Sequence, residues 1–266
     1  MPGLLDTLKS FKKQSYKNKE LIVVYSKSED RTLKIIKSSN IVNKIIYQNK
    51  PNLYNAINLG LKNANGDVIG ILHSDDIFFS SKSLEIVMKS YIKDKFDIAY
   101  GNILISKKNN FEDVIRNWKS KPFKKKKLKY GWMPPHVGLF ISKNNKNIIY
   151  NENYKISADY LYILKIFNRN KIIRYIDSYI TIMRAGGISS NHILKFREDL
   201  SVAKKYFKYY YLTILLKIIS KIFQFKTIKH DFDKKYINFF KDDKYKFTNN
   251  VNNIIKQKRF VLSAFN

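Results

Sequence analysis

The stretch that decides the fold lies at residues 66–78 and reads GDVIGILHSDDIF. Its apolar run, Val68 to Leu72, is followed closely by the adjacent carboxylates Asp75 and Asp76. A short apolar run bounded by turn residues predicts a buried strand. Ligands in open α/β sheets bind outside the carboxyl ends of the strands, so the pattern favours a site for a metal ion or a sugar phosphate. The alternative is an acidic turn after a core strand, without any ligand.

Composition sets the class of protein and raises candidate partners. With 266 residues, the chain is long enough for one domain and an extension. Its 51 Lys and Arg against 21 Asp and Glu give a formal charge of +30. Such a charge raises nucleic acids, anionic membranes and phosphorylated substrates as partners. Lys, Asn, Ile, Tyr and Phe share A/T-rich codons, which is a second source of the excess. No groove-reading element is recognisable, so we expect no specific nucleic-acid partner.

Other site classes are excluded by residue content. The chain has no cysteine, which excludes disulfides and thiolate metal sites, and its 4 His show no zinc-ligand spacing. The N-terminus lacks a signal-peptide pattern. The apolar run at residues 209–216 ends at Lys217 and is shorter than the roughly 18 residues that span a bilayer. We therefore expect a cytoplasmic protein, or one peripheral on the inner face of the cytoplasmic membrane.

The order of predicted elements indicates an α/β fold. From residue 4 to about residue 180, short apolar runs alternate with segments of helical period, as in a sheet flanked by helices. Helices are predicted at 4–14, 29–37, 52–63, 83–91 and 158–168. Strands are predicted at 20–25, 44–47, 97–106, 137–142 and 172–176, in addition to the one that leads to Asp75.

Two basic segments leave alternatives open. Residues 116–129 contain eight Lys or Arg, which predicts a solvated loop, or an anion-facing one because it precedes the MPPH motif at 133–136. Residues 207–223 combine aromatic and aliphatic side chains with Lys208, Lys217 and Lys221. That pattern fits a helix on an anionic membrane, and equally an amphipathic helix packed on the domain.

Several motifs follow one another in a specific order. They are NLYNAINLG at 52–60, the acidic turn, MPPH at 133–136 with the strand after it, ISADY at 156–160 and MRAGGIS at 183–189. In this order and spacing the chain resembles the family 2 glycosyltransferases, inverting enzymes of the GT-A fold, and most closely their bacterial surface-polysaccharide branch. The resemblance implies a Rossmann-like mixed sheet flanked by helices at residues 1–190, followed by a helical extension at 191–266. It also implies transfer of a hexose from a nucleotide-diphosphate sugar, most readily a UDP-sugar, to a glycan or polyprenyl-linked acceptor.

The resemblance assigns roles residue by residue. Asp76 matches the acid that ligates Mn²⁺ or Mg²⁺, and Asp75 the acid that faces the donor ribose. The ion would stabilise the charge that develops on the departing diphosphate. Asp159 matches the general base that deprotonates the acceptor hydroxyl. For Asp159, a helix N-terminal acid favoured by the helix dipole is the structural alternative.

Four further residues are candidates for contacts with the donor. His136 follows two prolines before a predicted strand, and a structural role is its alternative. Arg184, with glycines after it, matches a mobile loop that closes over a diphosphate. Asn55 lies on the helix that borders the nucleotide site in similar enzymes, and Asp30 keeps the family pattern in the loop after strand 20–25.

Two departures from the family affect the nucleotide pocket. Members begin with an apolar strand that lies centrally in the sheet, whereas this chain starts at the helix that should follow it, so we expect that strand to be missing. Relatives also carry an acid that contacts the base where this chain has Tyr25, and Ser26, Lys27 and Arg31 replace the glycines expected next. The alternative function is therefore a catalytically inactive GT-A-fold module retained for binding or scaffolding.

Overall fold

The computed structural model describes residues 2–26, 28–49, 51–108, 110–169, 171–186, 191–226 and 260–265. The helices are α1 (Pro2–Lys12), α2 (Thr32–Ser38), α3 (Leu53–Asn63), α4 (Ser83–Asp94), α5 (Ala158–Arg169), α6 (His192–Tyr206) and α7 (Tyr210–Lys226). The strands are β1 (Lys19–Ser26), β2 (Lys44–Gln48), β3 (Val68–His73), β4 (Ile77–Phe78), β5 (Ile98–Lys107), β6 (Asn110–Trp118), β7 (Leu139–Ser142), β8 (Ile173–Arg184) and β9 (Phe260–Phe265). Short 3₁₀ helices form at η1 (Lys125–Tyr130), η2 (His136–Gly138) and η3 (Lys143–Asn145).

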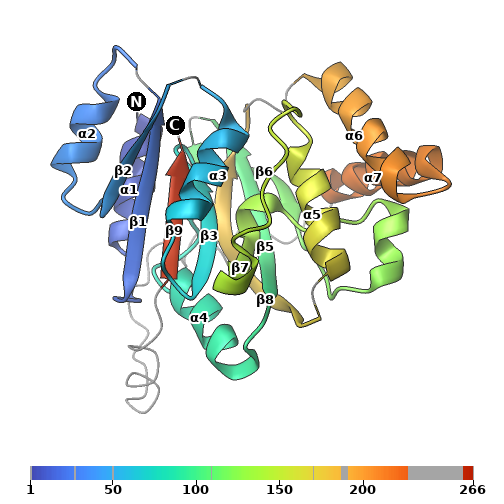
Figure 1. Ribbon diagram of the computed structural model, residues 1–266, viewed down its shortest axis with the longest axis horizontal. Coiled ribbons are helices and arrows are strands. Elements are labelled where there is room, and N and C mark those ends of the chain that lie inside the picture. The colour runs from blue at the N-terminus through green and yellow to red at the C-terminus, as the bar shows by residue number, and fades with distance from the viewer. Residues whose placement is uncertain are drawn as a thin grey trace.

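The strands of these residues form one mixed sheet with helices on both faces (Figure 1). The strand order is β2-β1-β9-β3-β7-β5-β8-β4, and β6 pairs with β5 beside this path. The pairs β1/β2, β1/β9, β9/β3 and β5/β8 are parallel, whereas β7 runs antiparallel between β3 and β5. This mixed sheet flanked by helices confirms the predicted fold class.

Alternate residues of the central strands pack into two hydrophobic cores. In β1, Ile22 and Val24 belong to one core and Leu21 and Val23 to the other. The first core contains side chains of α3, α5, α6 and α7, and the second contains side chains of α1, α2 and α4. A strand covered on both faces needs an unbroken apolar run, which is why the runs in β1 and β3 show no polar alternation.

Strand β9 fills the position that the sequence analysis expected to be empty. It lies parallel between β1 and β3, with Phe265 in register with Val24 on one side and His73 on the other. The backbone groups of β1 and β3 that face this position are therefore paired, as groups in the centre of a sheet must be. The expectation of a wholly helical extension is corrected at its end, because residues 260–265 return to the sheet.

Three local expectations also differ from the structure. Residues 116–118 belong to β6, which pairs antiparallel with β5, and residues 125–130 form η1, so the basic segment is not one solvated loop. Strand β8 extends to Arg184, beyond the predicted end at residue 176, because it pairs along β5 and β4. Helix α2 starts at Thr32 because the carboxylate of Asp30 accepts the Thr32 N–H at 3.0 Å.

Helices α6 and α7 occupy much of the predicted extension and join the main core. Val202 of α6 and Ile214 of α7 are buried in the same cluster as α3 and α5. Lys217 is buried too and pairs with Asp199 of α6 at 3.0 Å, whereas Lys208 of the same segment is exposed. The boundary at residue 190 between domain and extension stays a prediction.

Candidate functional site

The acidic turn Ser74-Asp75-Asp76 follows β3 and is held by α1. The hydroxyl Oγ1 of Thr7 lies 2.9 Å from the Ser74 carbonyl oxygen and 2.7 Å from that of Asp76. Within the turn, the Asp76 N–H donates to the His73 carbonyl at 3.1 Å. A Cβ added to Gly3 would lie 3.1 Å from the Cβ of Asp75, so the start of α1 approaches the turn as closely as glycine allows. The backbone of both acids is therefore fixed.

Asp76 is a buried carboxylate with one satisfied oxygen. Its Oδ1 accepts the backbone N–H of Arg184 at 3.0 Å, whereas Oδ2 has no hydrogen-bond partner among the described residues. Burial raises the pKa of Asp76 well above its ordinary value, and the charge of Asp75 raises it further. An unsatisfied buried oxygen is costly unless something binds it, and an oxygen-preferring cation is one suitable partner.

The carboxylates of the acidic turn suit a cation that takes only some of its ligands from the protein. Among the described residues, no group of three or more His, Asp or Glu side chains is arranged to hold a metal ion. Mg²⁺ is usually bound by one or two carboxylates, with substrate phosphates and water in the remaining positions. Asp76 fits that arrangement, and it does not fit a metal site built entirely from protein side chains.

Arg184 lies at the end of β8 and is already engaged. Its Nη2 pairs with Asp6 of α1 at 2.6 Å, and its Nη1 donates to the Lys108 carbonyl at 3.2 Å. The guanidinium also lies 3.9 Å from the ring centre of Phe111. The predicted closing cation is thus placed beside the acidic turn and held by these contacts, while residues 187–190 of the predicted loop lie outside the described residues.

Two histidines lie beside the acidic turn in a buried aromatic setting. The rings of His73 and His136 have centres 5.9 Å apart, and Nε2 of His136 lies 2.7 Å from the hydroxyl oxygen of Tyr150. Burial lowers the pKa of both histidines, that of His136 to about 4. Both imidazoles are therefore neutral at pH 7, available for hydrogen bonds and not as charges.

Asp159 comes from α5, a different element from the strand that leads to the acidic turn. It lies half-buried in the first turn of α5, and its Oδ1 accepts the N–H of Tyr160 at 2.7 Å. Its negative charge acts on His73 and on His136, and the charge of Asp75 also acts on His73. The predicted base and the acidic turn are thus both within electrostatic range of His73.

Asp30 lies in a separate loop after β1. Its Oδ1 accepts from the Ser28 hydroxyl at 2.7 Å and from the Thr32 N–H, and these bonds lower its pKa. The hydroxyl of Tyr25 closes the same loop by accepting the Ser28 N–H at 2.9 Å. Tyr25, which replaces the expected acid, is therefore a buried structural centre of this loop.

Asn55 contacts residues that precede α5. Its side-chain amide donates to the Glu152 carboxylate at 3.2 Å, and the neighbouring Asn58 donates to Glu152 at 2.8 Å. Asn52 caps α3 by accepting the N–H groups of Tyr54 and Asn55. These contacts join α3 to the segment before α5 and leave the predicted nucleotide role of Asn55 as a prediction.

Sequence reasoning missed several residues that shape the site. Asp6 pairs with Arg184 although 178 positions separate them, and Thr7 holds the acidic turn. His73 was visible as the polar end of an apolar strand, which is a signal that points to a site. Nothing local marks Asp6 or Thr7, because their roles depend on where α1 packs.

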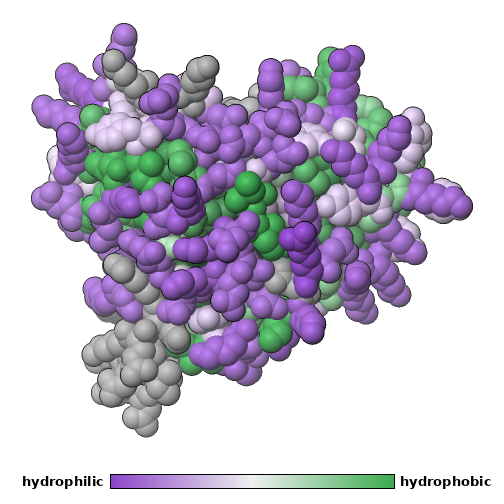
Figure 2. Space-filling model, in the orientation of Figure 1, coloured by the Kyte–Doolittle hydropathy of each residue, from purple (hydrophilic) through white to green (hydrophobic). Residues whose placement is uncertain are grey.

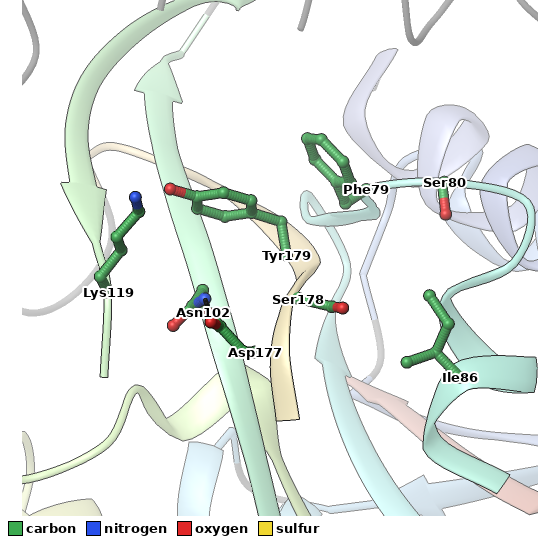
Figure 3. Close-up of a pocket in the computed structure, with 8 residues that line it drawn as sticks. All are labelled: Phe79, Ser80, Ile86, Asn102, Lys119, Asp177, Ser178 and Tyr179. Atoms are coloured by element: carbon green, nitrogen blue, oxygen red, sulfur yellow. Dashed lines mark hydrogen bonds between the residues drawn. The ribbon is translucent and has the colours of Figure 1, made fainter. Parts of the chain in front are cut away.

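A pocket of about 370 Å³ lies away from these residues (Figure 3). It is lined by Phe79, Ser80, Ile86, Asn102, Lys119, Asp177, Ser178 and Tyr179. In Figure 3 these side chains come from β5, β8, the residue after β6 and the segment around the start of α4. None of the predicted site residues lines it, and its Asp177 carboxylate is bound by Asn102 at 3.1 Å. We do not assign it to the candidate site.

Comparisons with known proteins agree with the fold. The family model described as Glycosyl transferase family 2 matches residues 2–146. No curated protein matches the chain. The crystal structure of S. aureus TarS 1–349 has a TM-score of 0.57 at 17% identity, covering 76% of this chain and 61% of that one.

Two other S. aureus TarS structures are similar. One gives a TM-score of 0.57 at 16% identity and covers 76% of this chain and 37% of that one. TarS 1–349 in complex with UDP gives 0.56 at 15% identity, covering 77% of this chain and 61% of that one. At these identities the likeness concerns the fold, and this chain spans less than two thirds of the length of those proteins.

Proposed function

Because the chain belongs to glycosyl transferase family 2, we propose that it transfers a hexose, with inversion, from a nucleotide-diphosphate sugar to a hydroxyl of a glycan or polyprenyl-linked acceptor. The expected setting is synthesis of a cell-surface polysaccharide. One observation carries the proposal: Oδ2 of Asp76 is buried and has no hydrogen-bond partner among the described residues. The charge of Asp159 acts on His73 and His136, which supports a place for the base near this acid. A metal-binding acid and a base on one side of a sheet are what the reaction requires.

The proposed chemistry uses Asp159 as the base. Its carboxylate accepts the proton of the acceptor hydroxyl while the hydroxyl oxygen bonds to the anomeric carbon of the donor. The bond from that carbon to the diphosphate oxygen breaks, and the nucleoside diphosphate leaves with the electron pair. Attack opposite the leaving group inverts the anomeric centre. Asp76 would hold Mn²⁺ or Mg²⁺, and the ion would neutralise charge on the departing diphosphate.

The donor is proposed to be a UDP-sugar that extends along the carboxyl edge of the sheet. A fold neighbour, TarS 1–349, has been solved with UDP, which supports this nucleotide. In the proposal, Asp75 contacts the ribose, His136 and Asn55 border the donor, and Asp30 shapes the loop after β1. Arg184 contacts the diphosphate, which then competes with Asp6 for the guanidinium.

We extend the proposal to an acceptor at the inner face of the cytoplasmic membrane. No helix in the described ranges has the length and hydropathy to cross a bilayer. Helix α7 nevertheless leaves apolar side chains exposed on its outer face, while the molecular face in Figure 2 is mostly hydrophilic with separate hydrophobic patches. The exposed large apolar residues of α7 are Tyr211, Leu212, Leu215, Ile218, Ile219 and Ile222. An apolar helix face on a basic chain fits peripheral contact with anionic lipid.

Vesicle sedimentation tests this contact. The protein should sediment with phosphatidylglycerol vesicles, and less with neutral phosphatidylcholine vesicles, because both charge and apolar burial contribute. Leu215→Ser combined with Ile222→Ser should release it, whereas Tyr47→Ser, at an exposed position on β2, should not. Equal binding by all three proteins would contradict a role for α7.

Release of nucleoside diphosphate from a panel of nucleotide sugars tests the activity. Turnover should require Mn²⁺ or Mg²⁺ and should fall about 100-fold or more in Asp159→Asn, the usual range for loss of a general base. Asp76→Asn should abolish the metal dependence together with most of the turnover. Asp113→Asn, at a half-buried β6 position where the carboxylate pairs with Lys107, serves as the matched control. Unchanged turnover in Asp76→Asn or Asp159→Asn would overturn the corresponding role.

The second candidate is an inactive GT-A-fold module that binds or scaffolds. The loop closed by Tyr25 favours it, because a tyrosine ring occupies the position of the acid that contacts the base in relatives. Calorimetry separates the two candidates: an active enzyme binds a nucleotide sugar in the presence of metal, and a module of this kind binds none.

A further inference from the structure

Two adjacent acids of α6 take up the free hydrogen-bond donors in front of α5. Oε1 of Glu198 accepts the backbone N–H of Lys155, and Oε2 accepts those of Ile156 and Ser157, each at 2.8 Å. Oδ1 of Asp199 accepts the hydroxyl of Ser157 at 2.7 Å. One carboxylate with three backbone donors, beside a second bound to the adjoining hydroxyl, fixes the entry of α5 in position and direction.

Two lysines lie close to the second of these acids, Asp199. Asp199 pairs with Lys217 of α7 at 3.0 Å and lies 3.7 Å from Lys195. Burial opposes ionisation of Asp199, but Lys217, Lys195 and the Ser157 hydroxyl keep its pKa below the ordinary value. The Lys217 ammonium also lies 3.4 Å from the ring centre of Tyr160, the residue after Asp159. Helices α6 and α7 therefore contact the start of α5 on both sides of Asp159.

The other face of the same segment is anchored by α3. The hydroxyl of Tyr54 donates to the Ile156 carbonyl, and the Ser157 carbonyl accepts the Leu161 N–H at 3.2 Å. Polar backbone groups on both sides of the turn before Asp159 are thus occupied. The Asp159 carboxylate bonds locally, by accepting the Tyr160 N–H, so the direction of its side chain depends on the backbone that carries it.

We propose that Glu198 and Asp199 are positioning residues that hold Asp159 toward the acceptor hydroxyl, with Lys217 keeping the Asp199 carboxylate in place. This inference rests on the proposed function, in which Asp159 is the base. It gives helices α6 and α7, which follow the family-matched residues 2–146, a part in the chemistry. Displacement of a reacting group by about 1 Å costs roughly 100-fold in rate, so a loosened anchor should reduce turnover.

Glu198→Gln is the direct test because it keeps the size of the side chain. Its amide group would turn two donors toward backbone N–H groups, so the three-fold anchor cannot persist. We expect kcat to fall about 10- to 100-fold, within the range for a displaced reacting group, with the donor KM within about twofold. Amide hydrogen exchange at residues 155–157 should accelerate. Glu112→Gln, on β6, should change neither.

Ser157→Ala is the second variant, and it leaves no unpaired charge because Asp199 keeps Lys217. It should lower kcat several-fold with an unchanged thermal midpoint. Wild-type kcat in Glu198→Gln, despite faster exchange at residues 155–157, would overturn the positioning role, as would unchanged exchange. Failure of the proposed function and failure of the positioning role can be distinguished. Full turnover in Asp159→Asn would remove the base role. Lost turnover in Asp159→Asn, together with wild-type turnover in Glu198→Gln, would remove only the positioning role.

Discussion

Deletion of residues 260–266 should prevent folding, although it removes only the last strand of the chain. The six residues of β9 are in register with Lys19–Val24 of β1 and with Val68–His73 of β3. In a ladder, half of a strand's N–H and C=O groups point to each side, so about six groups on each neighbour would lose their partners. At about 1 kcal/mol or more for each unsatisfied buried group, the loss is roughly 12 kcal/mol. That value lies within the about 5–15 kcal/mol that separates folded from unfolded domains.

Circular permutation provides the matched control, because it retains every residue. A chain that begins at Phe260, continues through Asn266 into Met1 and ends at residue 259 should fold with the same sheet. Phe265 is in register with His73, and Gly3 approaches Asp75, two residues further on. The new connection therefore has only residues 266, 1 and 2 to cross a short distance. It would also give the order strand, α1, β1 that members of the family show.

Circular dichroism, thermal unfolding and size-exclusion chromatography distinguish the outcomes. The deletion variant should lack a cooperative transition, and the permutant should unfold within a few degrees of the parent. A cooperative transition of normal midpoint in the deletion variant would refute the central placement of β9. A dimeric parent together with a monomeric permutant would show that β9 is supplied by a second copy, which contradicts pairing within one chain.

The histidine pair and the turn at Gly131 give two further expected outcomes. Burial lowers the pKa of His136 from 6.5 to about 4, so the unfolded state binds a proton in this window and the folded state does not. Stability should therefore fall by about 3 kcal/mol between pH 6.5 and pH 4. The free energy of unfolding, measured with urea at several pH values, should change less with pH in His136→Gln than in the parent. An equal dependence on pH would contradict the buried, neutral state of His136. In Gly131→Ala, the new Cβ at φ 76° would lie 2.6 Å from the Lys217 Cβ and push against α7. Gly186→Ala is the control, because its Cβ would meet a strained backbone but no close neighbour. Gly131→Ala should lose roughly 1–3 kcal/mol more in the free energy of unfolding than Gly186→Ala, as measured by urea unfolding.

The positions of the acidic turn and of Asp159 in the fold were predictable because their signals are local, whereas the role of Asp159 as the base stays a prediction. An apolar run that ends in Asp75 and Asp76 describes a buried strand and its carboxyl end without reference to any other part of the chain. The same holds for Asp159 at the start of a helix. Their convergence around His73 was not in the local pattern, and it came from the resemblance in motif order.

Residues whose roles come from packing were not predictable. Asp6 looks like an ordinary acid of an N-terminal helix until α1 is placed against β8, where it pairs with Arg184. Arg116 and Trp118 were taken for part of a charged loop because the Lys count outweighed the alternation that lets β6 pair with β5. The sequence around Glu198 does not predict its hydrogen-bond partners, because the backbone amides that it binds lie some forty positions earlier.

Strand β9 shows the limit most clearly, because its own sequence is not ambiguous. Residues 260–265 read FVLSAF, an apolar and aromatic run that suits a buried strand. Its neighbours in the sheet are set by non-local pairing, and the order of elements along the chain does not specify them. The expectation of a missing strand beside the nucleotide pocket followed from chain order alone. With Phe265 lying between Val24 and His73, the end of the chain borders the acidic turn. Donor binding should therefore depend on the last residues of the sequence as much as on the first helix, and the permutant should retain the turnover of its parent.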